Sequence, residues 1–155
     1  MNNKILIRSA SEKDVPAIFS LIKELADYEK LSDQVDTTED KLKKVLFGEN
    51  NFVEILIAEY EGQIVGQALF FKNFSTFLGK PGIYLEDLYV KPEMRSKGIG
   101  KALLDKIISL AKERNYGRVE WAVLDWNESA IEFYEKIGAK KLKEWKIFRL
   151  TSEKF

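Results

Sequence analysis

The chain has 155 residues, is 45% hydrophobic, and carries 25 basic and 25 acidic side chains. This length suits one domain with a sizeable core, and we predict a single domain over residues 1–155. A formal net charge of zero argues against a nucleic-acid partner, which calls for a basic balance. No apolar run approaches membrane-spanning length and the N-terminus is unlike a signal peptide, so we expect a soluble cytoplasmic protein without a membrane partner.

The sequence contains neither cysteine nor histidine. Without cysteine there is no disulfide framework, no thiolate nucleophile and no cysteine–zinc site. Without histidine, the commonest general base and the usual imidazole metal ligand are also missing, so we expect no metal. If the protein is an enzyme, its protons must move through Glu, Asp, Tyr, Lys, Ser, Thr or water.

The first elements in chain order are a strand and two helices. Residues 4–8 predict a short strand, and Ser11 with Asp14 forms a capping-box pattern that predicts a helix start. That helix ends near Tyr28, and its apolar face comprises Val15, Ile18, Phe19, Ile22 and Leu25. A second short helix is predicted from Thr38, with an inner side of Leu42, Val45 and Leu46.

Strands dominate the middle of the chain. Residues 52–59 and 64–71 predict an antiparallel hairpin, because the turn between them contains Gly62. A loop over residues 73–80 and a central strand over residues 83–90 are expected next.

The last third of the chain predicts two more helices and two more strands. A helix begins near Ile99 and stops at residues 115–117, and residues 118–124 form a strand. The inner, apolar stripe predicted for this helix is Ile99, Leu103, Leu104, Ile107, Ile108 and Ala111. Asn127 is a good N-cap for a further helix that Gly138 ends, with an apolar side of Ala130, Ile131, Tyr134 and Ile137. A last strand is predicted over residues 145–150. The fold class is therefore α/β, with a mixed sheet and helices on both of its faces.

A loop with two glycines connects the central strand to the helix that follows it. The strand stops at Pro92, and Arg95, Gly98 and Gly100 lie in the connection. Backbone N–H groups at a helix N-terminus, together with the helix dipole, favour an anion. We therefore expect a phosphorylated ligand on residues 96–101.

Two adjacent acids, Glu86 and Asp87, interrupt the central strand. The alternation places Ile83, Leu85 and Tyr89 on one face and Tyr84, Leu88 and Val90 on the other, so both faces are apolar. A buried carboxylate needs a partner, solvent or a raised pKa. The pair is therefore a candidate catalytic or cation-binding site, with the alternative that the strand opens there and both acids face water.

The loop from Arg95 to Gly100 resembles the R-x-x-G-x-G pyrophosphate loop of the GNAT acyltransferase superfamily, and the element order agrees with that fold. The chain is also similar, nearly end to end, to the diamine (spermidine/spermine) acetyltransferases. The motifs that carry this similarity are residues 21–29, 84–87 and 126–128, and Phe133-Tyr134 followed by Gly138-Ala139. Ser96 departs from the pattern, since many members have glycine at this position.

The resemblance implies a GNAT domain that binds acetyl-CoA and acts as a homodimer. The implied cofactor-binding residues are Leu88, Tyr89, Val90, Arg95, Ser96, Lys97, Gly98, Ile99, Gly100, Lys101, Asn127, Ala130 and Tyr134. The implied substrate-binding residues are Tyr28, Glu29, Glu86 and Asp87.

The implied reaction moves an acetyl group to a primary amine of a polyamine, a diamine or a lysine-like substrate such as thialysine. Glu86 would accept the ammonium proton through water, Asp87 would assist, and Tyr134 would protonate the departing thiolate. Without cysteine or histidine, we expect direct transfer in a ternary complex. Two alternatives stay open: acetylation of a peptide or protein amine, and a non-catalytic CoA-binding regulatory module. A dinucleotide-binding fold is weaker, because G-x-G here lacks the full fingerprint.

Overall fold

The computed structural model describes residues 4–155, which form two compact units, one ending at Ala122 and the other spanning Val123–Phe155. The single domain predicted from the sequence stays a prediction. None of the helices within residues 4–155 combines the length and the apolar composition that a membrane crossing requires.

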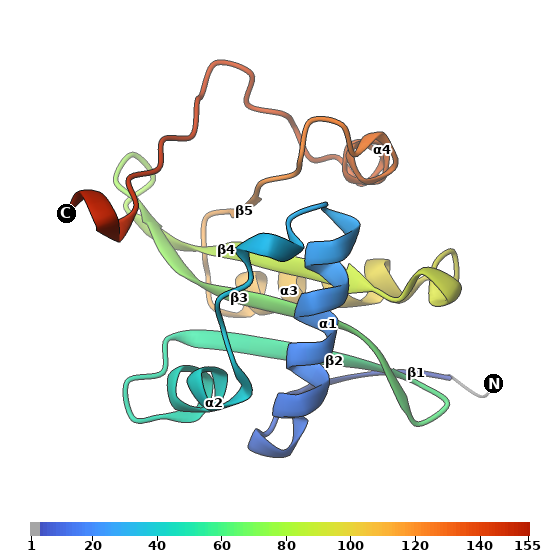
Figure 1. Ribbon diagram of the computed structural model, residues 1–155. Helices are drawn as coiled ribbons and strands as arrows, with labels where there is room; N and C mark the ends of the chain where they lie inside the picture. Colours follow the sequence, from blue (N-terminus) through green and yellow to red (C-terminus); the bar gives the residue numbers. More distant parts are fainter. Residues whose placement is uncertain (1–3) are drawn as a thin grey trace. The chain divides into compact units, whose positions relative to one another are not determined.

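The first unit is an α/β structure built on one five-stranded sheet (Figure 1). Its elements are β1 (Ile5–Ser9), α1 (Val15–Tyr28), α2 (Glu39–Phe47), β2 (Val53–Tyr60), β3 (Gln63–Ser75), β4 (Lys80–Val90), α3 (Ile99–Glu113) and β5 (Val119–Trp121). The strands follow one another in sequence order, the first four antiparallel and β5 parallel to β4. This confirms the mixed sheet.

Local signals in the sequence set the ends of these elements. Ser11 and Asp14 form the predicted capping box, and the Thr38 side chain accepts a hydrogen bond from the Lys41 N–H at the start of α2. The β2–β3 turn has positive φ at both Glu61 (49°) and Gly62 (82°), as a two-residue type I′ hairpin requires. These predicted boundaries are confirmed.

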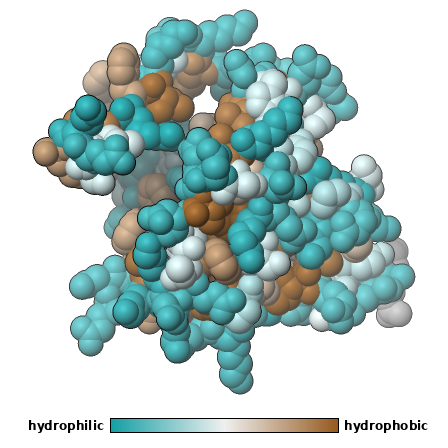
Figure 2. All heavy atoms as spheres, in the orientation of Figure 1, coloured by the Kyte–Doolittle hydropathy of each residue, from teal (hydrophilic) through white to brown (hydrophobic). Residues whose placement is uncertain are grey.

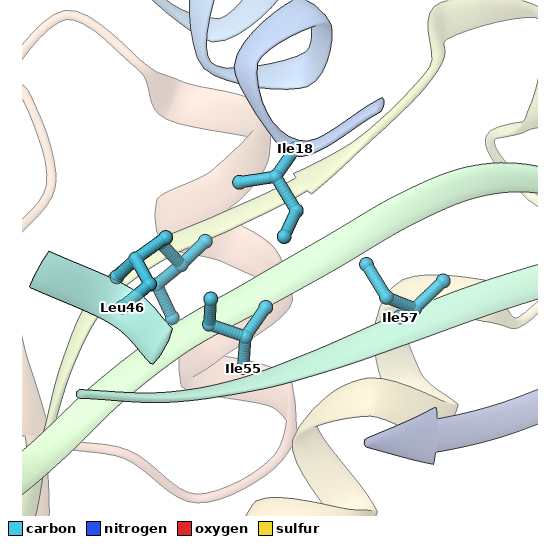
Figure 3. Close-up of a cluster of buried hydrophobic side chains, with 5 residues drawn as sticks. Ile18, Leu46, Ile55 and Ile57 are labelled. Carbon is cyan, nitrogen blue, oxygen red and sulfur yellow. The ribbon is translucent and has the colours of Figure 1, made fainter. Parts of the chain in front are cut away.

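The sheet carries helices on both faces, with α1 in front of it and α3 behind it in Figure 1. Between the sheet and the two front helices lies an apolar cluster: Ile18, Leu46, Ile55, Ile57 and Leu69. Figure 3 shows Ile18 of α1 above Ile55 and Ile57 of β2. On α3, the buried stripe is Ile99, Leu103, Leu104, Ile107 and Ala111. Polar and charged side chains cover most of the surface seen in Figure 2, with apolar atoms between them.

Two residues predicted to be on inner helix faces are exposed. Val45 of α2 is 51% exposed and Ile108 of α3 is 46% exposed. Both lie at the edge of an apolar stripe whose centre is occupied by Leu46 and Ile107, which are buried. Helical spacing shows which face of a helix is apolar, but the element packed against that face determines how many of its edge residues are buried.

A β-bulge in β4 changes the faces predicted for the central strand. Leu69 lies opposite Asp87 and Phe70 opposite Leu85, so Glu86 is the extra residue. Such an insertion turns all later residues to the other face.

The bulge places Asp87 and Tyr89 on the face that α1 covers. Leu88 and Val90 instead share the α3 face with Leu85, and Val90 Cγ2 lies 3.8 Å from where a Cβ at Gly100 would be. The alternation predicted across Glu86 is therefore wrong, because a strict period of two assumes a regular ladder.

Pairing decides the lengths of the other strands. β3 extends to Ser75 and β4 begins at Lys80, so the loop predicted over residues 73–80 shrinks to a short turn. β5 pairs only with Ile83, Tyr84 and Leu85 and is shorter than the strand predicted over residues 118–124.

The second unit contains α4 (Glu128–Lys136). Asn127 caps it as predicted, accepting a hydrogen bond at Oδ1 from the Ala130 N–H at 3.4 Å. Gly138, with φ of 97°, lies two residues after its end. The strand predicted over residues 145–150 is wrong, because these residues form neither helix nor strand. Strand-like composition needs a neighbouring ladder, and no described strand pairs with this segment.

Candidate functional site

The far half of β4 has an open edge. Antiparallel pairing with β3 runs along the whole strand, whereas pairing with β5 stops at Leu85. Within residues 4–155, no strand pairs with residues 86–90 on the β5 side. Backbone groups at such an edge are available to a ligand that binds as an added strand. Leu88, Tyr89 and Val90, predicted to bind the pantetheine arm, all lie on this segment.

The loop after β4 has the geometry of an anion site. Gly98, with φ of 82°, is the N-cap of the 15-residue helix α3, and Ile99, Gly100 and Lys101 form its first turn. The first N–H groups of a helix have no partner within it. Ser96 also has positive φ, 63°, which is the conformation that glycine adopts most readily.

Gly100 has no packing reason to be glycine. A Cβ at this position would meet only Val90 Cγ2, at the ordinary contact distance of 3.8 Å, among the atoms of residues 4–155. Glycine lowers helix stability relative to alanine. Its presence in the first turn of α3 therefore fits close approach of a ligand to the backbone, as a pyrophosphate requires.

Three carboxylates meet where β4 passes the end of α1. Glu86 is exposed at the bulge, Asp87 is partly buried on the α1 face, and Glu29 is the residue that caps the C-terminus of α1. Burial, together with the charges of Glu86 and Glu29, raises the pKa of Asp87 to about 6. Burial also raises the pKa of Glu29. Such a cluster attracts a cation and can accept a proton near neutral pH.

The structure thus brings together Tyr28, Glu29, Asp87 and the loop from Arg95 to Lys101 in the first unit. The Arg95 guanidinium carbon lies 4.7 Å from the ring centroid of Tyr28, the last residue of α1. Of the cofactor loop, Ile99 is buried in the core, while Ser96, Lys97 and Gly98 are exposed.

Asn127, Ala130 and Tyr134 lie in the second unit, on or just before α4. The rings of Tyr134 and Phe133 have centroids 5.5 Å apart. Asn127 is engaged as the helix cap, so its side-chain oxygen already has a structural role.

One contact of this region was not predicted from the sequence. Lys91 Nζ lies 3.3 Å from Oε2 of Glu24, which joins the end of β4 to α1. The sequence signal was weak: Glu24 belongs to an acidic helix face, and such faces are usually solvated. Among residues 4–155, no cluster of His, Cys, Asp and Glu residues is arranged to hold a metal ion.

Comparison with known proteins shows the family and the fold of the chain. The family model described as "Acetyltransferase (GNAT) family" matches residues 16–139. Thialysine N-epsilon-acetyltransferase of Sus scrofa is 42% identical over 160 aligned residues, which cover 96% of this chain and 94% of that protein. Spermidine/spermine N(1)-acetyltransferase-like protein 1 of Homo sapiens is 33% identical over 95% of this chain, but the match covers only 22% of that longer protein.

A solved structure shows the same fold. An aminoglycoside acetyltransferase from an uncultured soil metagenomic sample superposes with a TM-score of 0.80, with 23% identity and 97% coverage of both chains. The fold class predicted from the sequence and the resemblance to acetyltransferases are confirmed.

Proposed function

Since the chain belongs to the GNAT acetyltransferase family, we propose that it transfers the acetyl group of acetyl-CoA to a primary amine of a small polycationic or lysine-like substrate. Polyamines, diamines and thialysine are the candidates. The observation that carries the proposal is the acidic cluster on β4 beside an open strand edge and an anion-binding loop. One strand thus offers a cation site and a place for a phosphorylated co-substrate.

The residues present fit acetyl-CoA. The open edge from Glu86 to Val90 suits the amide groups of the pantetheine arm, and Ser96 to Lys101 suit its pyrophosphate. Lys97 and Lys101 add positive charge to this loop. Asn127, Ala130 and Tyr134 complete the proposed cofactor-binding set. The bound co-substrate supplies a thioester whose carbonyl carbon accepts the amine.

The acids of β4 prepare the amine. An alkyl amine has a pKa near ~10.4 and arrives as an ammonium, so it must lose a proton before it attacks. Glu86 at the bulge accepts this proton through water, and Asp87 assists. Tyr28 and Glu29 border the amine.

Two further groups serve the thioester. A backbone N–H of β4 stabilises the oxyanion that forms when the amine attacks. Tyr134 donates its phenolic proton to the departing thiolate as general acid. Transfer is direct, within a ternary complex.

The charges of the site favour a cationic substrate over a neutral one. Glu29, Glu86 and Asp87 are all acidic, and Asp87 is affected by the other two. A polyamine places several ammonium groups near such a cluster, whereas thialysine also brings a carboxylate, which these acids would repel. If the acidic cluster contacts the substrate, polyamines should therefore be acetylated faster than thialysine.

The test is release of the CoA thiol from acetyl-CoA with spermidine, spermine, putrescine, thialysine, lysine and a lysine peptide. Wild type, Glu86→Gln, Asp87→Asn and Tyr134→Phe are compared. We expect rapid turnover of a free amine by the wild type. Turnover should fall about a hundredfold in Tyr134→Phe, which removes the general acid, and in Glu86→Gln, which removes the base. Turnover of the peptide alone would indicate a protein substrate. Acetyl-CoA binding without turnover of any amine would contradict the proposal.

We further propose that the protein is a cytoplasmic homodimer. Acetyl-CoA is an intracellular metabolite, which supports the location. The end of β3 and the turn after it expose Phe74, Phe77 and Leu78, of which Phe77 is fully exposed. A second copy would shield such apolar side chains from water. Light scattering on the purified protein gives the mass, and a monomer at micromolar concentration would contradict the dimer.

A further inference from the structure

Two basic side chains from the β4–α3 connection contact the last turns of α1. Lys91 Nζ lies 3.3 Å from Glu24 Oε2, and the Arg95 guanidinium carbon lies 4.7 Å from the ring centroid of Tyr28. Glu24 and Tyr28 are four residues apart, so they share one side of the helix. The loop that offers its N–H groups to phosphate is thereby joined at two points to the end of α1.

Arg95 makes two additional contacts that turn its side chain back over the end of β4. Its Nε donates a hydrogen bond to the Val90 carbonyl oxygen at 3.0 Å, and its guanidinium carbon lies 5.5 Å from the Tyr89 ring centroid. Tyr89 is only 4% exposed, so this ring is held by the core. A planar guanidinium can contact aromatic faces while Nε donates, which a lysine ammonium cannot do.

We propose that Arg95 is a positioning residue for the amine: its side chain holds Tyr28, and with it Glu29, against β4. This inference rests on the proposed function, which assigns Tyr28 and Glu29 to the amine. The backbone of Arg95 adjoins Ser96, the first residue of the proposed phosphate-binding segment. Arg95 therefore lies between the residues proposed for the amine and those proposed for the phosphates. The side chain acts on the amine half, although the R-x-x-G-x-G pattern suggested a cofactor ligand.

The test separates the KM for the amine from the KM for acetyl-CoA in Arg95→Met and Arg95→Lys. We expect Arg95→Met to raise the amine KM about tenfold, since two cation–π contacts are lost, with the acetyl-CoA KM within about twofold of wild type. The amine KM of Arg95→Lys should lie between those of wild type and Arg95→Met, because lysine keeps the charge. Lys97→Met is the matched control from the same loop, and it should raise the acetyl-CoA KM instead.

An acetyl-CoA KM that rises as much as the amine KM would overturn the proposal, as would no change in either constant. If Arg95→Met does not fold, Arg95→Lys carries the test with the same expected direction.

Failure of the proposed function is recognised separately, because wild type would then acetylate no amine. In that case melting of Arg95→Met, Tyr28→Leu and the double variant tests the contact itself. Non-additive shifts in the melting temperature support the contact, and additive shifts refute it.

Discussion

Asp87 shows how a residue proposed to assist the reaction can carry a cost in stability. It lies on the α1 face of β4, partly buried, near Glu86 and Glu29, and these surroundings raise its pKa to about 6. A carboxylate that loses its proton near neutral pH suits a reaction that removes a proton from an ammonium group. The same surroundings make its charged form unfavourable in the folded state.

Asp87→Asn should therefore stabilise the free protein above pH 6. The folded-state pKa of Asp87 exceeds the unfolded value near ~4, so its stabilising contribution is full below pH 4 and is lost as the pH rises through about 6. We expect the variant to gain about 1–2 kcal/mol in unfolding free energy at pH 7.5 and nothing at pH 4. Urea unfolding at both pH values measures this.

Glu86→Gln is the matched control, because Glu86 is the exposed neighbour, and its unfolding free energy should change by less than about 0.5 kcal/mol. A loss of stability in Asp87→Asn at pH 7.5 would show that the carboxylate has a stabilising partner.

At Gly100, helix stability and the approach of a ligand favour different residues. Gly100→Ala should stabilise the free protein by about 0.5 kcal/mol, because alanine favours the helix and a Cβ fits beside Val90. It should raise the acetyl-CoA KM about tenfold if the pyrophosphate approaches this backbone. Thermal melts and steady-state kinetics measure the two effects.

Ala102→Gly provides the control two residues later in α3. It should destabilise the protein by about 0.5–1 kcal/mol without changing the acetyl-CoA KM. An unchanged KM in Gly100→Ala would remove the reason proposed for this glycine.

At the scale of elements, a partly buried ion pair fixes the start of α1 against the sheet. Arg8 of β1 binds both carboxylate oxygens of Asp14, at 2.8 and 2.9 Å, and its Nε donates to Glu59 of β2 at 2.9 Å. The Ser11 N–H also donates to Asp14 Oδ2 at 2.7 Å. These contacts join two strands to the start of α1. They therefore help to fix the helix whose other end carries Tyr28 and Glu29, the residues proposed to border the amine.

Asp14→Asn should cost about 2 kcal/mol at pH 7. Hydrogen bonds from the Arg8 guanidinium lower the pKa of Asp14 to about 2, so its stabilising contribution is present above pH 4 and is lost as the pH falls through about 2. Denaturant unfolding at pH 7 and pH 3 should show the difference from wild type shrinking at the lower pH.

Asp105→Asn removes an exposed i,i+4 pair with Lys101 and should cost nothing measurable. Equal effects of the two substitutions would mean that the Arg8–Asp14 pair adds no more than a surface contact.

At the scale of the whole molecule, ligand binding should be visible as stability. A ligand at a concentration of 100 times its Kd stabilises the folded state by about 2.7 kcal/mol. For a chain of 155 residues, this corresponds to a melting temperature about 5–10 °C higher. Acetyl-CoA should produce this shift and adenosine, which lacks the phosphates, should not. Equal shifts with both ligands would mean that the phosphates, and hence the loop proposed to bind them, contribute nothing to the affinity.

The sequence by itself determined the elements and the loop that matter most. Capping residues such as Ser11, Thr38 and Asn127 act within four residues of themselves, so they are readable from the chain, and the turn at Gly62 is equally local. The position of the glycine loop before α3 was likewise predicted, because its glycines and the apolar stripe after it are adjacent in sequence.

Only the tertiary structure decided which side chains meet. The bulge at Glu86 arises from the pairing of β3 with β4 and moves Asp87 and Tyr89 to the α1 face. The Arg95–Tyr28 contact joins residues 67 positions apart in the sequence. Residues 145–150 have strand-like composition but form no strand. In each case the deciding interaction is non-local, and periodicity carries no information about a partner far away in the chain.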